Sequence, residues 1–186
     1  MKIDQAKAEQ AIKDLLVAMG VNNDEEPYKG TANRYYRFLE ELFGDRDEKI
    51  KVFPEECHGG PIMLTGHRAW TLCPHHLLPV EFIVDVSYTP KRVLGNSTIM
   101  VLGLSKLPRL INQAVRKGPA LQEKLTQDIA LGIAEYADEV HVMVKGEHAC
   151  TTMRGVKTSG LMVTEYHYVS EEMRGRLVRP KIVPVN

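Results

Sequence analysis

The sequence predicts an α+β fold: an antiparallel sheet, two helices packed on one face of it, and a helical extension at the N-terminus. Three observations lead to this prediction. Two amphipathic helical patterns come first, extended segments follow, and two further helical patterns precede the last strands. This order lacks the regular strand–helix alternation of a parallel doubly wound sheet. We assign residues 1–48 to the extension and residues 49–186 to the main domain.

Two helices are predicted in the extension. The first begins after Asp4, a candidate N-cap, and stops before Gly20. Its apolar face comprises Ala8, Ile12, Leu15, Leu16 and Met19. A polar stretch over 22–30 leads into the second helix, which ends at Gly44. The apolar face of that helix comprises Tyr35, Tyr36, Leu39, Leu42 and Phe43.

The clearest strand of the main domain covers residues 80–88. Apolar residues occupy every second position, which predicts a strand with one buried face. These residues are Val80, Phe82, Val84, Val86 and Tyr88. Further strands are expected at 69–72, 97–102, 140–144 and 161–169.

Two helices are predicted between the strands. Ser105 is a candidate N-cap for the first, whose apolar positions are Leu107, Leu110, Ile111, Ala114 and Val115. Gly118 and Pro119 interrupt the pattern, and a longer helix is expected from about 120 to 137. Its core side would carry Leu121, Leu125, Ile129, Ile133 and Tyr136.

The composition excludes several classes of protein. The chain has 186 residues, 44% apolar and 26% charged, with 24 basic and 24 acidic side chains and a pI near 7.1. This balance argues against a general binder of nucleic acid or of membrane surfaces. Three cysteines are a poor number for a disulfide framework, and neither a signal peptide nor a run of eighteen apolar residues is present. We therefore expect a cytoplasmic protein.

The densest chemical cluster is Cys73-Pro74-His75-His76, which follows a predicted strand. A thiolate and an imidazole three positions apart can close on one metal ion. Cys150 lies 150 − 73 = 77 positions later and adjoins another predicted strand. If the two strand ends meet, Cys73, His76 and Cys150 form a zinc site with a vacant fourth position, as in catalytic zinc sites.

Two other interpretations of this cluster stay open. In one, a fourth protein ligand completes a structural zinc site, and the candidates are His148, His75 and Cys57. In the other, the cysteine is simply buried beside hydrogen-bonded histidines. In the three-ligand case, His75 and His148 would lie unligated beside the ion, placed to move protons.

Two further sets of residues suggest a ligand. Lys106 and Arg109 stand at a predicted helix start, a place that favours anions, and Arg154 and Arg34 could add to them. Taken singly, each is more commonly a solvated surface charge. Gln122-Glu123 opens the next helix; acids are frequent there, but a carboxylate could also accept the two N–H donors of a guanine-like edge.

Four strings in this order resemble the GTP cyclohydrolase I family, the zinc enzymes that open pterin and folate synthesis. They are TLCPHHLLP at 71–79, GLSKLPRL at 103–110, LQEKLTQDIA at 121–130 and EHACTTMRGV at 147–156. The resemblance implies a tunnelling fold, assembled into rings that stack as a homodecamer, with active sites between subunits. GTP would be the substrate and Zn²⁺ the cofactor.

The resemblance also implies roles for individual residues. Cys73, His76 and Cys150 match the zinc ligands, and His75 and His148 match the proton-transfer histidines. The triphosphate and ribose neighbourhood corresponds to Ser105, Lys106, Arg109 and Arg154, with Arg34 as an addition. Ser105 is also a candidate participant in ribose rearrangement. Gln122 and Glu123 match the guanine-reading pair.

The chain departs from the family pattern at three places. Pro74 follows Cys73 where the family usually has Glu, so one carboxylate near the metal is absent, which bears on tuning more than on ligation. The segment KTSGLMVTE at 157–165 follows the usual Thr- and Ser-rich pattern only loosely. The tail after Ser170 also differs from the usual short ending.

The implied reaction is the hydrolytic opening of the guanine imidazole ring of GTP, which releases formate and gives 7,8-dihydroneopterin triphosphate. Zinc would activate water, and His75 or His148 would protonate the purine nitrogen. Two alternatives remain: a zinc-stabilised nucleotide- or pterin-binding protein without catalysis, suggested by Pro74 and the 157–165 segment, and a sister tunnelling-fold enzyme acting on a pterin or deazapurine. The Cys, His and Cys ligand set argues against the second.

Overall fold

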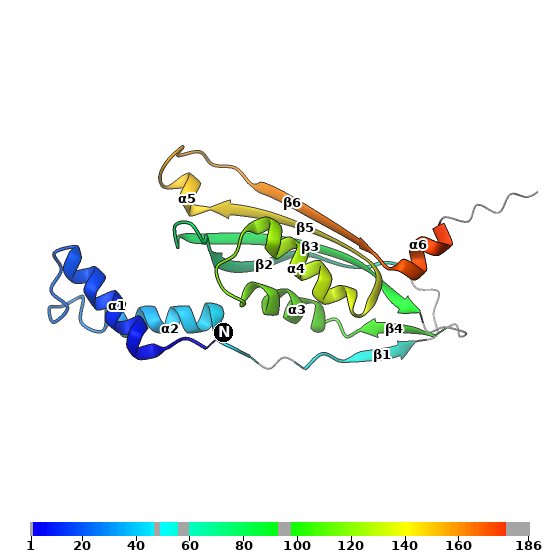
Figure 1. The fold of residues 1–186 in the computed structure, drawn as a ribbon, viewed down its shortest axis with the longest axis horizontal. Helices are drawn as coiled ribbons and strands as arrows, with labels where there is room; N and C mark the ends of the chain where they lie inside the picture. Colours follow the sequence, from blue (N-terminus) through cyan, green and yellow to red (C-terminus); the bar gives the residue numbers. More distant parts are fainter. Residues whose placement is uncertain (1, 47–48, 56–59, 93–97, 178–186) are drawn as a thin grey trace, which may run out of the picture.

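The structure, a computed structural model, describes residues 2–46, 49–55, 60–92 and 98–177. Within these residues six antiparallel strands form the sheet, in the order β1-β4-β3-β5-β6, and β2 also pairs with β3 (Figure 1). The strands are β1 (Val52–Glu55), β2 (Ile62–Leu72), β3 (Pro79–Arg92), β4 (Ile99–Leu102), β5 (Ala137–His148) and β6 (Met162–Val169).

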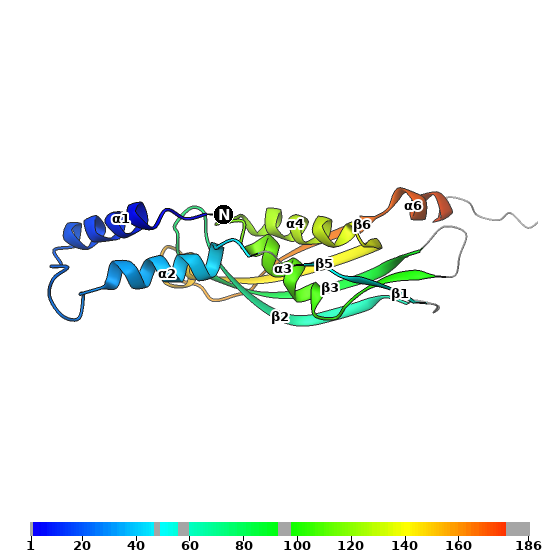
Figure 2. The ribbon, with the colours of Figure 1, turned by 90° about the horizontal axis from the view of Figure 1, so that it is seen from below.

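Helices α3 and α4 cover one face of this sheet, while α1 and α2 lie together beyond one of its ends (Figure 2). The helices are α1 (Gln5–Ala18), α2 (Thr31–Phe43), α3 (Lys106–Val115), α4 (Gln122–Ala134), α5 (Ala149–Thr152) and α6 (Glu171–Leu177). The predicted α+β fold with an antiparallel sheet and two helices on one face is confirmed. The division at residue 48 stays a prediction. None of the helices in the described ranges is long and apolar enough to cross a membrane.

The core forms between β3, β5 and the two covering helices. All five apolar residues predicted for the buried face of β3 are at most 1% exposed. In the β3–β5 register, Val84 pairs with Val144 and Val86 with Val142, so the buried faces of the two strands coincide. Ile111 of α3 and Ile129 of α4 pack against these strands from the helical side of the sheet and are at most 1% exposed. The alternating apolar residues in the sequence of β3 therefore correctly predict which face of that strand is buried.

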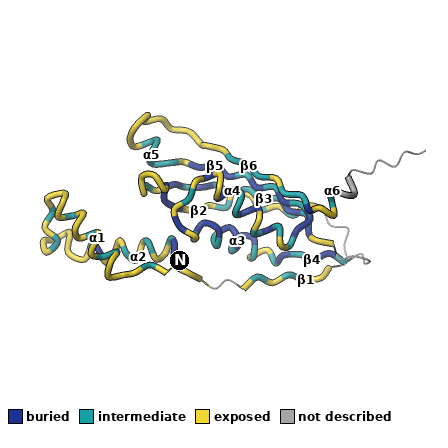
Figure 3. Tube along the Cα trace, viewed as in Figure 1, coloured by how far each residue is buried: buried dark blue, intermediate teal, exposed yellow. Residues whose placement is uncertain are grey.

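The predicted ends of the first helix in the extension are confirmed, but part of its expected apolar face is exposed to solvent. The Asp4 carboxylate accepts a hydrogen bond from the Lys7 backbone N–H at 3.1 Å, and Gly20 adopts a left-handed φ of 78° just past α1. Leu15 and Met19, expected on the apolar face of α1, are 54% and 68% exposed. Figure 3 shows α1 and α2 mostly exposed, in contrast to the sheet and its covering helices.

Several predicted boundaries are wrong for physical reasons. The helix expected over 120–137 is α4, which begins at Gln122 and ends at Ala134, because Ala137 already pairs with Pro90 of β3. Leu121 has an extended backbone and is 48% exposed, so it does not lie in the core. Ser105 stands at the start of α3, but its side chain makes no capping hydrogen bond.

Strand and helix lengths also differ from the prediction. The strands at 69–72, 80–88 and 140–144 are parts of the longer β2, β3 and β5. For the strand predicted over 97–102, residue 97 lies outside the described residues. The prediction contained neither α6 nor the short α5.

Candidate active site

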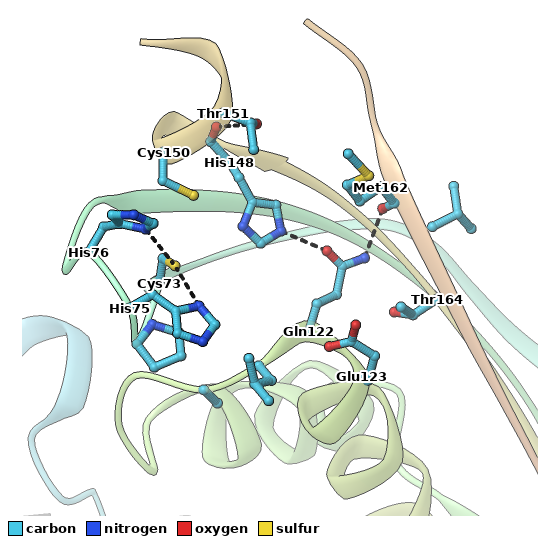
Figure 4. A pocket seen from close by; sticks show the side chains of 14 residues that line it. Cys73, His75, His76, Gln122, Glu123, His148, Cys150, Thr151, Met162 and Thr164 are labelled. Atoms are coloured by element: carbon cyan, nitrogen blue, oxygen red, sulfur yellow. Dashed lines mark hydrogen bonds between the residues drawn. The ribbon is translucent and has the colours of Figure 1, made fainter. Parts of the chain in front are cut away.

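A pocket of about 360 Å³ lies at the end of the sheet where β2, β3 and β5 meet. Four segments line it: the turn after β2, the start of α4, the junction of β5 with α5, and the start of β6 (Figure 4). The first residues of β3 explain this convergence. Leu72 pairs with Pro79, and Val80 pairs with His148, so the chain segments that follow β2 and precede α5 lie side by side.

Cys73, His76 and Cys150 come together in this pocket. Their ligand atoms all lie within 4.8 Å of one another, and Cys73 Sγ is 3.8 Å from His76 Nδ1. A sulfur and a nitrogen on one tetrahedral zinc ion would be about 3.6 Å apart, given the usual bond lengths. Two thiols and one imidazole in this arrangement could hold a metal ion, and zinc is the ion such a set prefers.

The candidate fourth ligands differ in position. Within the described residues, the group that could hold an ion contains neither His75 nor His148. His75 Nδ1 lies 3.9 Å from Cys73 Sγ, so its ring adjoins the group without completing it. Cys57 lies outside the described residues. The described part of the chain thus supports the three-ligand arrangement and leaves a position for water or substrate.

A tight turn presents the ligands Cys73 and His76. The Cys73 N–H donates to the carbonyl oxygen of Leu78 at 2.9 Å, and the Leu77 N–H donates to the carbonyl oxygen of Cys73 at 2.8 Å. Leu77 has a φ of 52°, a left-handed conformation that is uncommon for a residue with a side chain. The backbone bonds hold the strained turn in place, which fixes the two ligands relative to each other.

The surroundings of the Cys150 thiol disfavour its ionised form. Burial raises the pKa of the Cys150 thiol, the neighbouring Cys73 raises it further, and the Arg154 charge opposes the rise. A bound divalent ion would reverse this balance, because metal ligation requires the thiolate and releases the proton. The raised pKa therefore favours the protonated form of the Cys150 thiol, from which a bound ion would displace the proton.

Gln122 joins α4 to the sheet through its side-chain amide. It is 5% exposed, and its Nε2 donates to the carbonyl oxygens of Val144 at 3.0 Å and Met162 at 2.8 Å. Its Oε1 lies 2.8 Å from His148 Nε2 (Figure 4). Because an amide oxygen only accepts, His148 carries its proton on Nε2 and has its lone pair on Nδ1.

His148 is also held by packing and is kept neutral. Its ring meets the ring of Phe82 edge-on, with centroids 6.0 Å apart. Burial lowers the pKa of His148, and the Glu123 charge partly opposes this shift. A lowered pKa means that the imidazole is unprotonated at neutral pH and can accept a proton at Nδ1.

The predicted guanine-reading pair divides between two environments. Glu123, in the first turn of α4, is exposed and lines the pocket. Both ends of the Gln122 amide, in contrast, are used in contacts within the chain. The structure therefore assigns Gln122 a contact that orients His148, while its predicted contact with a guanine stays a prediction.

The predicted phosphate-binding residues do not line this pocket in the single chain. Ser105, Lys106 and Arg109 belong to the start of α3. The Arg34 guanidinium donates to the carbonyl oxygens of Pro27 and Lys29 and to Thr31 Oγ1, which secures the loop before α2. Arg154 follows α5, close enough to Cys150 to influence its pKa.

Sequence reasoning missed the contribution of β6. The carbonyl oxygen of Met162 accepts from Gln122, and Thr164 Oγ1 lies 2.6 Å from Thr126 Oγ1, beneath the start of α4. Met162 and Thr164 both line the pocket. A backbone carbonyl leaves no mark in the sequence, and the two threonines gave no signal because they stand 38 positions apart.

Comparison with known proteins gives consistent matches. A sequence model of the GTP cyclohydrolase I family matches residues 8–180. The GTP cyclohydrolase 1 of Thermoanaerobacter pseudethanolicus is 38% identical over 164 residues, covering 85% of this chain and 84% of the relative. That of Acetivibrio thermocellus is 37% identical over 164 residues, with the same coverage. A solved dihydroneopterin aldolase from Burkholderia thailendensis is 16% identical and covers 61% of this chain and 93% of its own, with a TM-score of 0.43.

Replacement of one ligand should abolish metal binding. We expect Cys150→Ser to lose bound zinc after dialysis, because two protein ligands hold the ion far more weakly than three. Metal content per chain, measured by mass spectrometry against the wild type, checks this. Cys57→Ser is the matched control and should keep its zinc; loss of zinc in that variant would instead support a fourth cysteine ligand.

Gly146 makes room for Gln122, so a methyl group there should disturb the site. A Cβ at this position would lie 2.3 Å from Gln122 Oε1 and 2.8 Å from a Phe82 ring carbon. We expect Gly146→Ala to lower the free energy of unfolding by about 1–3 kcal/mol in urea denaturation. Gly132→Ala is the control: its Cβ would meet nothing within 4 Å, so the α4 helix should gain up to about 1 kcal/mol. Equal changes in the free energy of unfolding for the two substitutions would contradict the conclusion that Gly146 makes room for Gln122.

Proposed function

The chain belongs to the GTP cyclohydrolase I family, and we propose that its pocket opens the guanine imidazole ring of GTP by hydrolysis, releasing formate and forming 7,8-dihydroneopterin triphosphate. The observation that carries this proposal is the convergence of Cys73, His76 and Cys150 beside a neutral, oriented His148. An open metal position and a proton acceptor in one pocket are what attack on a ring carbon by water requires.

Zinc is the proposed cofactor, held by Cys73, His76 and Cys150. When bound, it supplies the acidity that makes hydroxide available from water near neutral pH. The chain itself determines how protons move around that centre. His148 accepts or returns a proton at Nδ1, because its Nε2–H is engaged in a hydrogen bond to the Gln122 side-chain oxygen. His75, exposed beside Cys73, serves as the second proton carrier for the purine nitrogen.

Glu123 is the proposed selector for guanine. Its carboxylate stands at the pocket wall, where it can accept the two N–H donors on the guanine edge. Adenine lacks this pair of donors, so it would leave the carboxylate desolvated and unpaired. Sites of this kind discriminate between substrates by roughly 10⁴ to 10⁵.

The triphosphate-binding residues suggest that the working site includes a second copy of the chain. Lys106 and Arg109 are proposed to contact phosphate, with Ser105 nearby for ribose rearrangement, yet they do not line the pocket of their own chain. In a ring of subunits they can face the pocket of a neighbour, while Arg154 acts from within the chain. A homodecamer and a cytoplasmic location are parts of this proposal.

The direct test is turnover. Zinc-loaded protein is incubated with GTP, formate is quantified, and the oxidised product is examined for pterin fluorescence. Stoichiometric formate and fluorescence support the proposal. Tight GTP or pterin binding without formate would favour the binding-protein alternative, and retained activity after removal of the metal would refute the role of zinc.

Removal of His148 should separate catalysis from metal binding. We expect His148→Ala to retain its zinc, because this histidine lies outside the ligand group, and to lose formate release by about 10²- to 10⁴-fold. Formate assays paired with metal analysis check both parts. His67→Gln, on β2, should behave like the wild type. Loss of zinc from His148→Ala would instead identify His148 as a fourth ligand.

Loss of the Glu123 charge should affect substrate choice. We expect Glu123→Gln to weaken GTP binding by roughly 10- to 100-fold, because a hydrogen bond to a charged group contributes about 1.5–3 kcal/mol. Isothermal titration calorimetry with GTP and ATP measures the effect and the change in preference. Glu135→Gln, at the opposite end of α4, is the matched control. An unchanged preference for GTP over ATP in the Glu123 variant would remove the assignment.

A further inference from the structure

A second group of histidines and carboxylates lies on β5 and β6, away from the pocket. His141 of β5 stands directly opposite His167 of β6 in the strand register. Glu139 and Glu165 each lie two residues from a histidine on the same strand. We call these four residues the β5–β6 quartet.

The quartet lies on the face of the sheet opposite the core. On β5, Val140 and Val142 are fully buried, while Glu139 and His141 alternate with them and remain partly exposed. The side chains of His141 and His167 are 44% and 54% exposed. Both rings are therefore accessible to a small solute on this face of the described chain.

Two diagonal contacts organise the quartet. His167 Nε2 lies 2.8 Å from Glu139 Oε1, and His141 Nε2 lies 3.5 Å from Glu165 Oε2. The His167 imidazole donates to Glu139, because an ionised carboxylate only accepts, whereas the His141–Glu165 pair is a longer electrostatic contact. The nitrogen that His167 can offer to a ligand is consequently Nδ1, and Nδ1 is also the His141 nitrogen that lies away from its carboxylate contact. A histidine whose other nitrogen donates to a carboxylate is the usual arrangement around a protein-bound metal ion.

The spacing of the two rings also suits one shared ion. Their centroids are 6.0 Å apart and their planes are perpendicular. Two imidazoles bound to one ion at the usual metal–nitrogen distance of about 2.1 Å have centroids about 4.5–5.5 Å apart, so the two rings would need to approach each other by about 1 Å. Binding would require the side chains to rotate until both Nδ1 atoms face a common point, and the exposed face gives the rings room to do so.

We propose that the quartet is a second metal site, separate from the Cys73–His76–Cys150 group, for a first-row divalent ion that prefers imidazole nitrogen, such as Ni²⁺, Cu²⁺ or Zn²⁺. His141 and His167 supply the two protein ligands, and water fills the remaining positions. Glu139 orients the His167 ring, and Glu165 lies beside the His141 ring. Mg²⁺ and Ca²⁺ are disfavoured, because they prefer oxygen ligands.

Nickel titration of the zinc-loaded protein tests this site. We expect calorimetry to show one additional Ni²⁺ per chain while the bound zinc stays in place. His141→Ala and His167→Ala should each weaken nickel binding at least tenfold, and Glu139→Gln by about tenfold. His67→Gln is the matched control and should leave the affinity unchanged. Thermal unfolding of each variant without nickel checks that the fold is intact.

Cobalt distinguishes the two centres by spectroscopy. Co²⁺ added to zinc-loaded protein should give visible d–d absorption without a thiolate charge-transfer band, because the quartet contains no sulfur ligand. Absence of saturable Ni²⁺ binding would overturn the proposal. So would binding that persists unchanged in the His141→Ala/His167→Ala double variant, or cobalt spectra that show thiolate ligation.

Discussion

The pairing of β3 with β2 on one edge and with β5 on the other is the constraint on which the candidate site depends. Cys73 and Cys150 are far apart in the chain, yet each follows a strand that ends beside the start of β3. A slip of one residue in either register would turn the core side chains of that strand outward. The buried valines of β3 and β5 oppose such a slip, so the same hydrophobic interaction that stabilises the fold also holds the metal ligands together.

A second level of organisation comes from hydrogen bonds at the start of α4. Gln122 connects the helix to the carbonyl oxygens of β5 and β6 and holds one nitrogen of His148. This contact determines which nitrogen of the His148 ring carries the proton and which is left as an acceptor. Burial lowers the pKa of His148 and Glu123 partly opposes this shift, so the charge of Glu123 influences the protonation of the histidine that Gln122 holds.

Much of this could be predicted from the sequence, and the limits have physical causes. The alternation from Val80 to Tyr88 predicted the buried face of β3, because a two-residue repeat reports directly on strand geometry. The Cys-Pro-His-His string predicted that Cys73 and His76 lie close enough to share one ion, since three positions in a turn bring the side chains together. The contacts of Gln122 were not predictable, because they involve backbone carbonyls of two strands that pair only in the folded chain. Leu121 was misplaced because helical periodicity does not show where a helix begins.

Gly146 interrupts the run of buried valines on β5 and leaves a notch into which the Gln122 amide fits. Because the Gln122 side chain must reach this space, the fit restricts how α4 can be rotated about its own axis. One residue inserted into α4 between Gln122 and Glu123 would rotate the Gln122 side chain by about 100° relative to the rest of the helix, away from the notch. Changes in loop length between Gly118 and Leu121 leave that angle unaltered. During evolution, the connection before α4 is thus free to vary in length, whereas the first turn of the helix is not.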